Sequence, residues 1–143
     1  MSLTKHPSGL SAEQITEMLE LAAQTAERSY APYSKFRVGA AILLDDGSIF
    51  TGCNVENASY RVTTCAEQTA IAKAMSEVGP KIRLRAVAVA NLNGAASMPC
   101  GACRQTILEF GSPDTWIFFP GEDGPTDVSL AQLLPYGFHL AHD

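Results

Sequence analysis

Three of the four cysteines are placed where they could bind one metal ion together. Cys65 and Cys100 each stand at the start of a predicted helix, and Cys103 follows Cys100 after one helical turn. A helix N-terminus favours a thiolate, and the three-residue spacing puts Cys100 and Cys103 on one helical face. Three protein ligands leave the fourth position of a tetrahedral Zn²⁺ open, as in catalytic zinc sites. The pattern therefore predicts a catalytic zinc ion held by Cys65, Cys100 and Cys103.

Glu67 is the candidate proton-transfer group beside this metal. It lies two residues after Cys65, at the same helix start, where it could reach an activated water without being a ligand. Its position also suits stabilisation by the helix dipole, and both roles can hold at once. A redox pair at Cys100 and Cys103 is the alternative, but it leaves the segment from Cys65 to Glu67 unexplained. The remaining cysteine, Cys53, is expected to be a small buried hydrophobic residue.

Two segments around these residues resemble the zinc-dependent cytidine deaminases of the Cys₃ branch. They are Thr64-Cys-Ala-Glu-Gln-Thr-Ala70 and Pro99-Cys-Gly-Ala-Cys-Arg-Gln105. Three other segments are also similar to motifs of this family, at 34–41, 52–60 and 133–138, so that the resemblance spans roughly residues 12 to 138. It implies one Zn²⁺ per subunit and hydrolysis of cytidine and 2′-deoxycytidine to uridine and 2′-deoxyuridine, with release of ammonia.

The resemblance also implies residues that contact the nucleoside. Asn54 and Glu56 alternate with Val55 and should share one face of an extended segment, and the matching family residues bind the ribose 3′-hydroxyl. Phe36 matches an aromatic residue that packs on the pyrimidine ring, and Ala66 matches a residue whose backbone hydrogen-bonds the base. The residues alone also allow a solvated strand end for Asn54 and Glu56, and plain core packing for Phe36.

Two aromatic residues are assigned to subunit contacts by the same resemblance. Phe138 matches a residue that completes a neighbouring subunit's pocket, and Tyr60 matches one on the intersubunit surface. The resemblance therefore implies a homotetramer whose pockets are completed by neighbouring subunits.

Gln68 departs from the pattern of the Cys₃ branch. Three thiolates on Zn²⁺ leave a charge of about −1, and members of this branch commonly offset it with an arginine directly after the catalytic glutamate. Gln68 occupies that position here, as is usual in the branch with one histidine ligand. Either another cation, such as Arg61 or Arg104, supplies the compensation, or the metal is less electrophilic and turnover is slower.

Hydrophobic periodicity and turn residues define the elements that must position these side chains. The Ser11–Gln14 capping box starts the first helix, and Pro135 stops the last. Helices are predicted at 12–28, 65–77, 101–110 and 130–134; strands at 38–44, 49–53, 84–90 and 116–119; and a loop at 121–125.

This order suggests helices packed on a mixed sheet. The resemblance makes the expectation more specific: an α/β fold with three α/β/α layers and a five-stranded mixed sheet. We expect one domain over residues 1–143, with 1–10 and 139–143 as tails. His6, His139 and His142 lie outside every motif and are expected to be solvated.

Composition limits the classes of partner. The chain has 143 residues, a formal net charge of −5 and a mean hydropathy of +0.04, which is typical of a globular protein. The negative charge counts against nucleic acid as a partner. No stretch resembles a signal-peptide core, and the longest apolar run, 38–44, is too short to span a bilayer. We therefore expect a cytoplasmic protein without a membrane partner.

Two other functions fit parts of this pattern. A related deaminase could act on a modified cytosine nucleoside, a cytosine-containing antibiotic or a base within RNA. The net charge disfavours RNA, whereas Asn54 and Glu56 favour a nucleoside with a free sugar. A non-catalytic zinc module is the other possibility, but a structural site has no use for a proton carrier such as Glu67.

Overall fold

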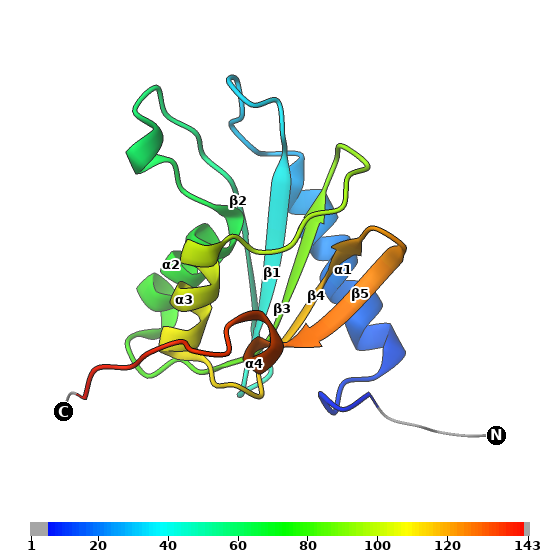
Figure 1. Cartoon of the computed structure of the whole chain (residues 1–143), viewed down its shortest axis with the longest axis vertical. Coiled ribbons are helices and arrows are strands. Elements are labelled where there is room, and N and C mark those ends of the chain that lie inside the picture. Colours follow the sequence, from blue (N-terminus) through cyan, green and yellow to red (C-terminus); the bar gives the residue numbers. More distant parts are fainter. Residues whose placement is uncertain (1–5, 142–143) are drawn as a thin grey trace.

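The computed structural model describes residues 6–141, which form one five-stranded mixed sheet flanked by helices (Figure 1). The strand order is β2-β1-β3-β4-β5; β3 and β4 run parallel, and every other neighbouring pair is antiparallel. The strands are β1 (Val38–Leu44), β2 (Ile49–Cys53), β3 (Leu84–Asn91), β4 (Trp116–Gly121) and β5 (Gly124–Ser129). The prediction of a five-stranded mixed sheet is confirmed.

Helices cover both faces of this sheet. They are α1 (Ala12–Ala26), α2 (Ala66–Val78), α3 (Gly101–Phe110) and the short α4 (Leu130–Leu133), with a 3₁₀ turn, η1, at Tyr60–Val62. Within residues 6–141, no helix combines the length and apolarity needed to cross a lipid bilayer.

Alternating side chains of β1 show how the layers are made. Ala41 and Leu43 belong to the core under α1, which contains Met18. Ile42 and Leu44 point to the other face and belong to the core that includes Ile71 of α2 and Ile107 of α3. Successive side chains of a strand face opposite sides, so one apolar run fills two cores. The predicted three-layer α/β/α arrangement is thereby confirmed.

Two glycines let helices lie directly on strands. A Cβ atom on Gly39 of β1 would come within 1.8 Å of the Ala22 carbonyl oxygen of α1. On Gly52 of β2 it would come within 2.4 Å of the Ala70 nitrogen and 2.7 Å of the Ala66 oxygen of α2. Gly52 therefore sets the distance between β2 and the first turns of α2.

The segment predicted as a loop at 121–125 is instead a tight hairpin. β4 and β5 pair antiparallel up to Gly121 and Gly124, and Gly124 has a φ of 111°, which favours glycine. The sequence of β5 is polar and contains Pro125, so it lacks the hydrophobic alternation that predicts a strand. Proline is tolerated there because β5 is an edge strand.

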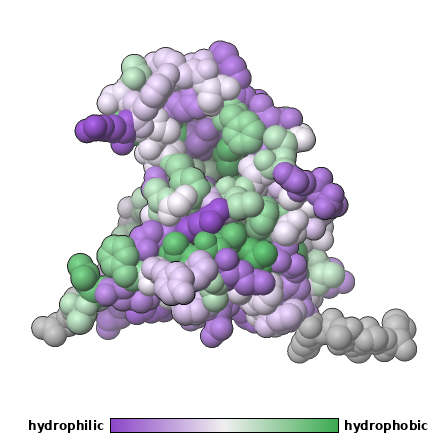
Figure 2. Space-filling model, in the orientation of Figure 1, coloured by the Kyte–Doolittle hydropathy of each residue, from purple (hydrophilic) through white to green (hydrophobic). Residues whose placement is uncertain are grey.

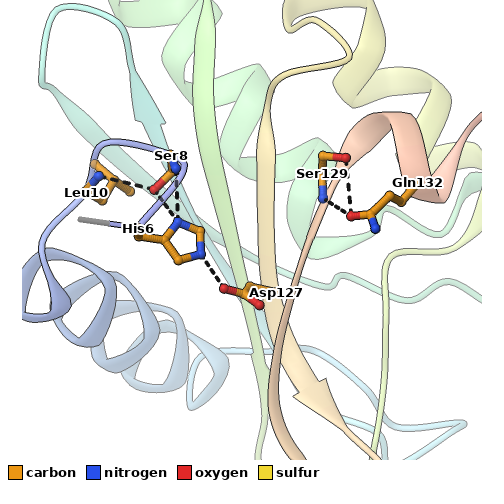
Figure 3. Close-up of polar contacts among 6 residues, drawn as sticks. All are labelled: His6, Ser8, Leu10, Asp127, Ser129 and Gln132. Atoms are coloured by element: carbon orange, nitrogen blue, oxygen red, sulfur yellow. Dashed lines mark hydrogen bonds and ion pairs between the residues drawn. The ribbon is translucent and has the colours of Figure 1, made fainter. Parts of the chain in front are cut away.

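The prediction of a solvated N-terminal tail is wrong for His6 and Leu10. His6 hydrogen-bonds Ser8 Oγ through Nδ1, at 2.8 Å, and the Asp127 carboxylate of β5 through Nε2 (Figure 3). Its ring meets that of Trp116 edge to face, and Leu10 is fully buried. The reason is that α1 packs mainly on β1 and β3 and leaves β4 largely uncovered on this face. The segment from residue 6 to 10 covers the side chains of β4 there. His139 is exposed as expected, and His142 lies outside the described residues.

Candidate metal centre and active site

The three cysteines predicted as ligands lie together between two helix starts. Cys65 is the N-cap of α2, Cys100 is the N-cap of α3, and Cys103 lies in the first turn of α3. Their sulfur atoms all lie within 4.8 Å of one another, and the Cys65 and Cys100 sulfurs are 3.9 Å apart. A tetrahedral zinc ion with Zn–S bonds of about 2.3 Å needs sulfurs about 3.8 Å apart. The three thiols therefore fit zinc in number, chemistry and spacing.

The thiols and Glu67 influence one another's protonation. A hydrogen bond with Cys103 lowers the pKa of the Cys65 thiol to about 7. The same contact, together with burial, raises the pKa of Cys103, so that Cys65 ionises before Cys103. Burial also raises the pKa of the Glu67 carboxyl, which is 3% exposed, against the opposing effect of hydrogen bonds from its own backbone N–H and from Cys103. The Glu67 carboxyl group therefore lies next to the Cys103 thiol.

A cavity of about 180 Å³ adjoins the thiols and Glu67. It is smaller than the clefts of about 300–1,000 Å³ that take drug-sized ligands, so it suits a ligand part about the size of a single ring. Of the residues predicted from the sequence, it brings together the three cysteines, Glu67, Phe36, Asn54 and Ala66. The other lining residues are Val38, Thr63, Val89, Ser97 and Met98.

These five lining residues were not predicted from the sequence, although three of them lie next to the segments that hold the ligands. Ser97 and Met98 lie in the connection between β3 and the ligand-bearing helix α3, so this connection must pass the metal centre. Thr63 likewise directly precedes the segment that begins with Thr64 and holds the first ligand.

The structure does not place Glu56 at the cavity beside Asn54. The Glu56 carboxylate accepts hydrogen bonds from the backbone N–H groups of Tyr33 and Ser34, at 3.0 and 3.1 Å, and from the Ser34 hydroxyl. The Ser34 hydroxyl is the main cause that lowers the pKa of Glu56. Asn54 is nearly buried; its amide oxygen accepts from Val38 N at 2.9 Å and its amide nitrogen donates to Phe36 O at 2.8 Å. Both side chains thus hold the segment that carries Phe36.

The two aromatic residues assigned to subunit contacts lie away from the cavity. Tyr60 is 77% exposed in η1, and Phe138 is 63% exposed in the segment after α4. The carbonyl oxygen of Phe138 accepts a hydrogen bond from Gln105 of α3 at 2.9 Å. The Tyr60 ring meets the Tyr33 ring edge to face, with centroids 6.3 Å apart, and both Tyr60 and Phe138 remain largely exposed.

Gln68 acts on the ligand helix through the backbone. Its side-chain oxygen accepts a hydrogen bond from Cys65 N at 3.2 Å, which closes a capping box at the start of α2. Cysteine stands here where serine or threonine usually caps, so the sequence pattern concealed the motif.

Neither arginine considered as a compensating cation hydrogen-bonds a ligand sulfur within residues 6–141. Arg104 donates to Pro99 O at 2.8 Å, to Leu133 O at 3.1 Å and to Met98 Sδ at 2.8 Å. Its guanidinium thus joins the ligand helix α3 to the chain before Cys100 and to the end of α4. Arg61 lies in the exposed turn η1.

Comparisons with known proteins agree with this geometry. Residues 12–119 match the family described as the cytidine and deoxycytidylate deaminase zinc-binding region. A cytidine deaminase of Sporosarcina psychrophila is 42% identical over 87% of this chain and 90% of its own length. One of Mycobacterium tuberculosis is 45% identical over 83% and 85% of the two chains.

Solved structures show the same likeness. The crystal structure of the Mycobacterium tuberculosis cytidine deaminase has a TM-score of 0.76 at 43% identity, over 87% of this chain and 97% of that one. The cytidine deaminase of Burkholderia pseudomallei has a TM-score of 0.77 at 38% identity, over 90% and 100% of the two chains. With its cysteine triad, its α/β/α layers and these relatives, the chain belongs to the family of zinc-dependent cytidine and deoxycytidylate deaminases.

Proposed function

We propose that this protein is a zinc-dependent cytidine deaminase that converts cytidine and 2′-deoxycytidine, with one water, into uridine or 2′-deoxyuridine and ammonia. The observation that carries the proposal is one small cavity lined by the buried Glu67 carboxyl group, which is hydrogen-bonded to Cys103, and by all three thiols. A zinc module without catalysis would have no use for a buried carboxyl group there.

Cys65, Cys100 and Cys103 are proposed to hold the zinc ion. When bound, zinc acts as a Lewis acid that makes water a nucleophile near neutral pH. Glu67 accepts a proton from the attacking water and delivers protons to N3 of the cytosine ring and then to the departing amino group. Its buried position excludes bulk water from these transfers.

Phe36, Ala66 and Asn54 are proposed to position the nucleoside. Phe36 packs on the ring, and the backbone of Ala66 hydrogen-bonds the base. Asn54 and Glu56 are assigned to the ribose 3′-hydroxyl. Three donors already occupy the Glu56 carboxylate, which has about four acceptor positions, so one remains for a sugar hydroxyl. Since these contacts concern the 3′-hydroxyl, removal of the 2′-hydroxyl should be tolerated.

The assembly is proposed to be a homotetramer in the cytoplasm, with pockets completed by neighbouring subunits. Large hydrophobic side chains are exposed at Tyr60, Tyr136 and Phe138, and Figure 2 shows further hydrophobic residues across the middle of one face. Exposed apolar surface of this kind is typical of protein interfaces. The negative net charge supports a free nucleoside over a nucleic acid as substrate.

Ammonia release tests the proposed activity. The zinc-loaded protein should release ammonia from cytidine and 2′-deoxycytidine. Glu67→Gln should lower kcat by about 100- to 10,000-fold while retaining its zinc, because only the proton carrier is removed. Metal content should be measured for both proteins. A zinc-loaded wild type that releases no ammonia from any cytosine nucleoside would contradict the proposal.

A further inference from the structure

The chain segment that carries Phe36 has a strained backbone. Lys35, directly before Phe36, has a φ of 60°, the only positive φ of a non-glycine residue within the described part of the chain. This left-handed region is disfavoured for a side chain such as lysine. Phe36 itself precedes β1, so no ladder of strand hydrogen bonds fixes its position. The surroundings of the segment must therefore hold Lys35 and Phe36 in place.

Asn93 binds the backbone on both sides of Phe36. Its amide nitrogen donates to Lys35 O at 2.9 Å, and its amide oxygen accepts from Arg37 N at 3.0 Å. The carboxamide thus offers this segment the donor and acceptor pair that a neighbouring strand would offer. Leu92, the preceding residue, adds a backbone bond from its N–H to Arg37 O at 3.0 Å.

Asn91 fixes the same loop to a second part of the cavity lining. Its amide oxygen accepts from the N–H groups of Asn93 and Ala95, at 3.0 and 3.2 Å. Its amide nitrogen donates to Ala95 O at 2.8 Å and to Ser97 Oγ at 3.1 Å. Ser97 and its neighbour Met98 line the cavity, as Phe36 does. The two asparagines therefore connect two separate parts of the lining, although neither belongs to it.

We propose that Asn91 and Asn93 are positioning residues that fix Phe36 relative to Ser97 and Met98 and so set the width of the base pocket. The substrate class rests on the proposed function, but the hydrogen-bond network does not. A misplacement of about 1 Å in a reacting pair can lower a rate by about 100-fold, so such a network matters beyond its contribution to stability. Asn93 is exposed, so its bonds should contribute little to the stability of the whole fold.

Asn93→Ala tests the proposal when compared with a matched variant far from the cavity. Asp46→Ala is that control, because Asp46 also accepts two exposed bonds, from Ser48 N and Ser48 Oγ, in the turn beyond the opposite end of β1. All measurements use the zinc-loaded full chain. They are kcat and KM with cytidine and with 5-methylcytidine, the unfolding midpoint, the zinc content, and the affinity for uridine by calorimetry.

We expect Asn93→Ala to lower kcat/KM for cytidine by about 10- to 100-fold with zinc retained. Uridine binding should weaken, and the preference for cytidine over 5-methylcytidine should narrow because the pocket is less tightly defined. Asp46→Ala should keep kcat/KM within about twofold of wild type. Adding Lys35→Asn to Asn93→Ala should recover part of the loss, because asparagine adopts positive φ more readily than lysine.

The proposal is overturned if Asn93→Ala keeps the kcat/KM and the uridine affinity of the wild type. It is also overturned if Asp46→Ala, at an equal loss of stability, loses as much kcat/KM and uridine affinity as Asn93→Ala does. Uridine binding separates this inference from the proposed function. A wild type that binds uridine but releases no ammonia contradicts only the function, and the variants are then compared by uridine affinity. A wild type that binds no uridine contradicts both.

Discussion

Gln68 shows how one side chain can serve a metal centre without touching the metal. Its oxygen caps the start of α2 and thereby fixes the backbone of Cys65, the first ligand. In the Cys₃ branch that this sequence resembles, arginine at this place commonly offsets the charge of the thiolates. Arg104, the nearby candidate for that role, instead binds two carbonyl oxygens and Met98. The capping role and the charge at position 68 can therefore be tested separately.

Gln68→Ala should lower the free energy of unfolding by about 1 kcal/mol, because Cys65 N loses its acceptor. Gln68→Glu keeps the acceptor and should unfold like wild type, but it adds negative charge beside the thiolates and should lower kcat by about 10- to 100-fold. Gln68→Arg should raise kcat for the opposite reason. Denaturant titration and steady-state kinetics provide the measurements. If Gln68→Ala has the same free energy of unfolding as the wild type, the Gln68 cap does not stabilise the fold. If Gln68→Glu and Gln68→Arg have equal kcat, charge at position 68 does not affect the reaction.

The residues that could be predicted from the sequence are those whose chemistry lies in one short segment. Cys65 and Glu67 share a helix start, and so do Cys100 and Cys103. The hydrogen bonds of Glu56 could not be predicted, because they depend on how the chain around Ser34 folds back onto the chain after β2.

At the scale of elements, α2 depends on Gly52 for its distance from the sheet. The helix backbone passes so close to β2 that a methyl group at Gly52 cannot fit without a shift. Because α2 begins with Cys65 and carries Glu67, its displacement moves a ligand and the proton carrier together. Gly39 has the same relation to α1, on the face away from the metal centre.

Gly52→Ala and Gly39→Ala therefore form a matched pair. Both should lower the free energy of unfolding, by about 1–3 kcal/mol or more, because each overpacks a helix against a strand. Only Gly52→Ala should also weaken zinc affinity and lower kcat of the folded protein, by about 10-fold or more. Zinc affinity is measured by competition with a chelator. The kcat is measured at a temperature well below the unfolding midpoints of both variants. Equal losses of zinc affinity in the two variants would contradict this account.

Element prediction succeeded where the segments are apolar, including the edge strand β2 at 49–53, and failed at the polar edge strand β5. The apolar runs of β1 and β3 and the capped helix α1 are evident in the sequence, although α1 ends at Ala26, two residues before the predicted end. β5 is partly exposed and polar, so its strand character depends on pairing with β4, which no local pattern reveals.

At the scale of the whole molecule, the proposed sharing of pockets between subunits leads to a specific prediction. Glu67→Gln and Phe138→Ala should each impair every pocket of a homotetramer. In co-expressed mixed tetramers, about a quarter of the pockets would combine an intact Glu67 with an intact Phe138 from a neighbour. The mixture should then be more active than the average of the two variants. An activity equal to that average, or a monomer in sedimentation, would contradict the shared pocket.

The contacts of His6 have a practical consequence for anyone who shortens this chain. A design that begins at Ser11, where the first helix is capped, discards both His6 and Leu10. It uncovers the rings of Trp116 and Phe118, which His6 touches and which both lie on β4, the strand next to the edge strand β5. An uncovered apolar face beside an unpaired strand invites aggregation, so a fusion partner or purification tag belongs ahead of His6.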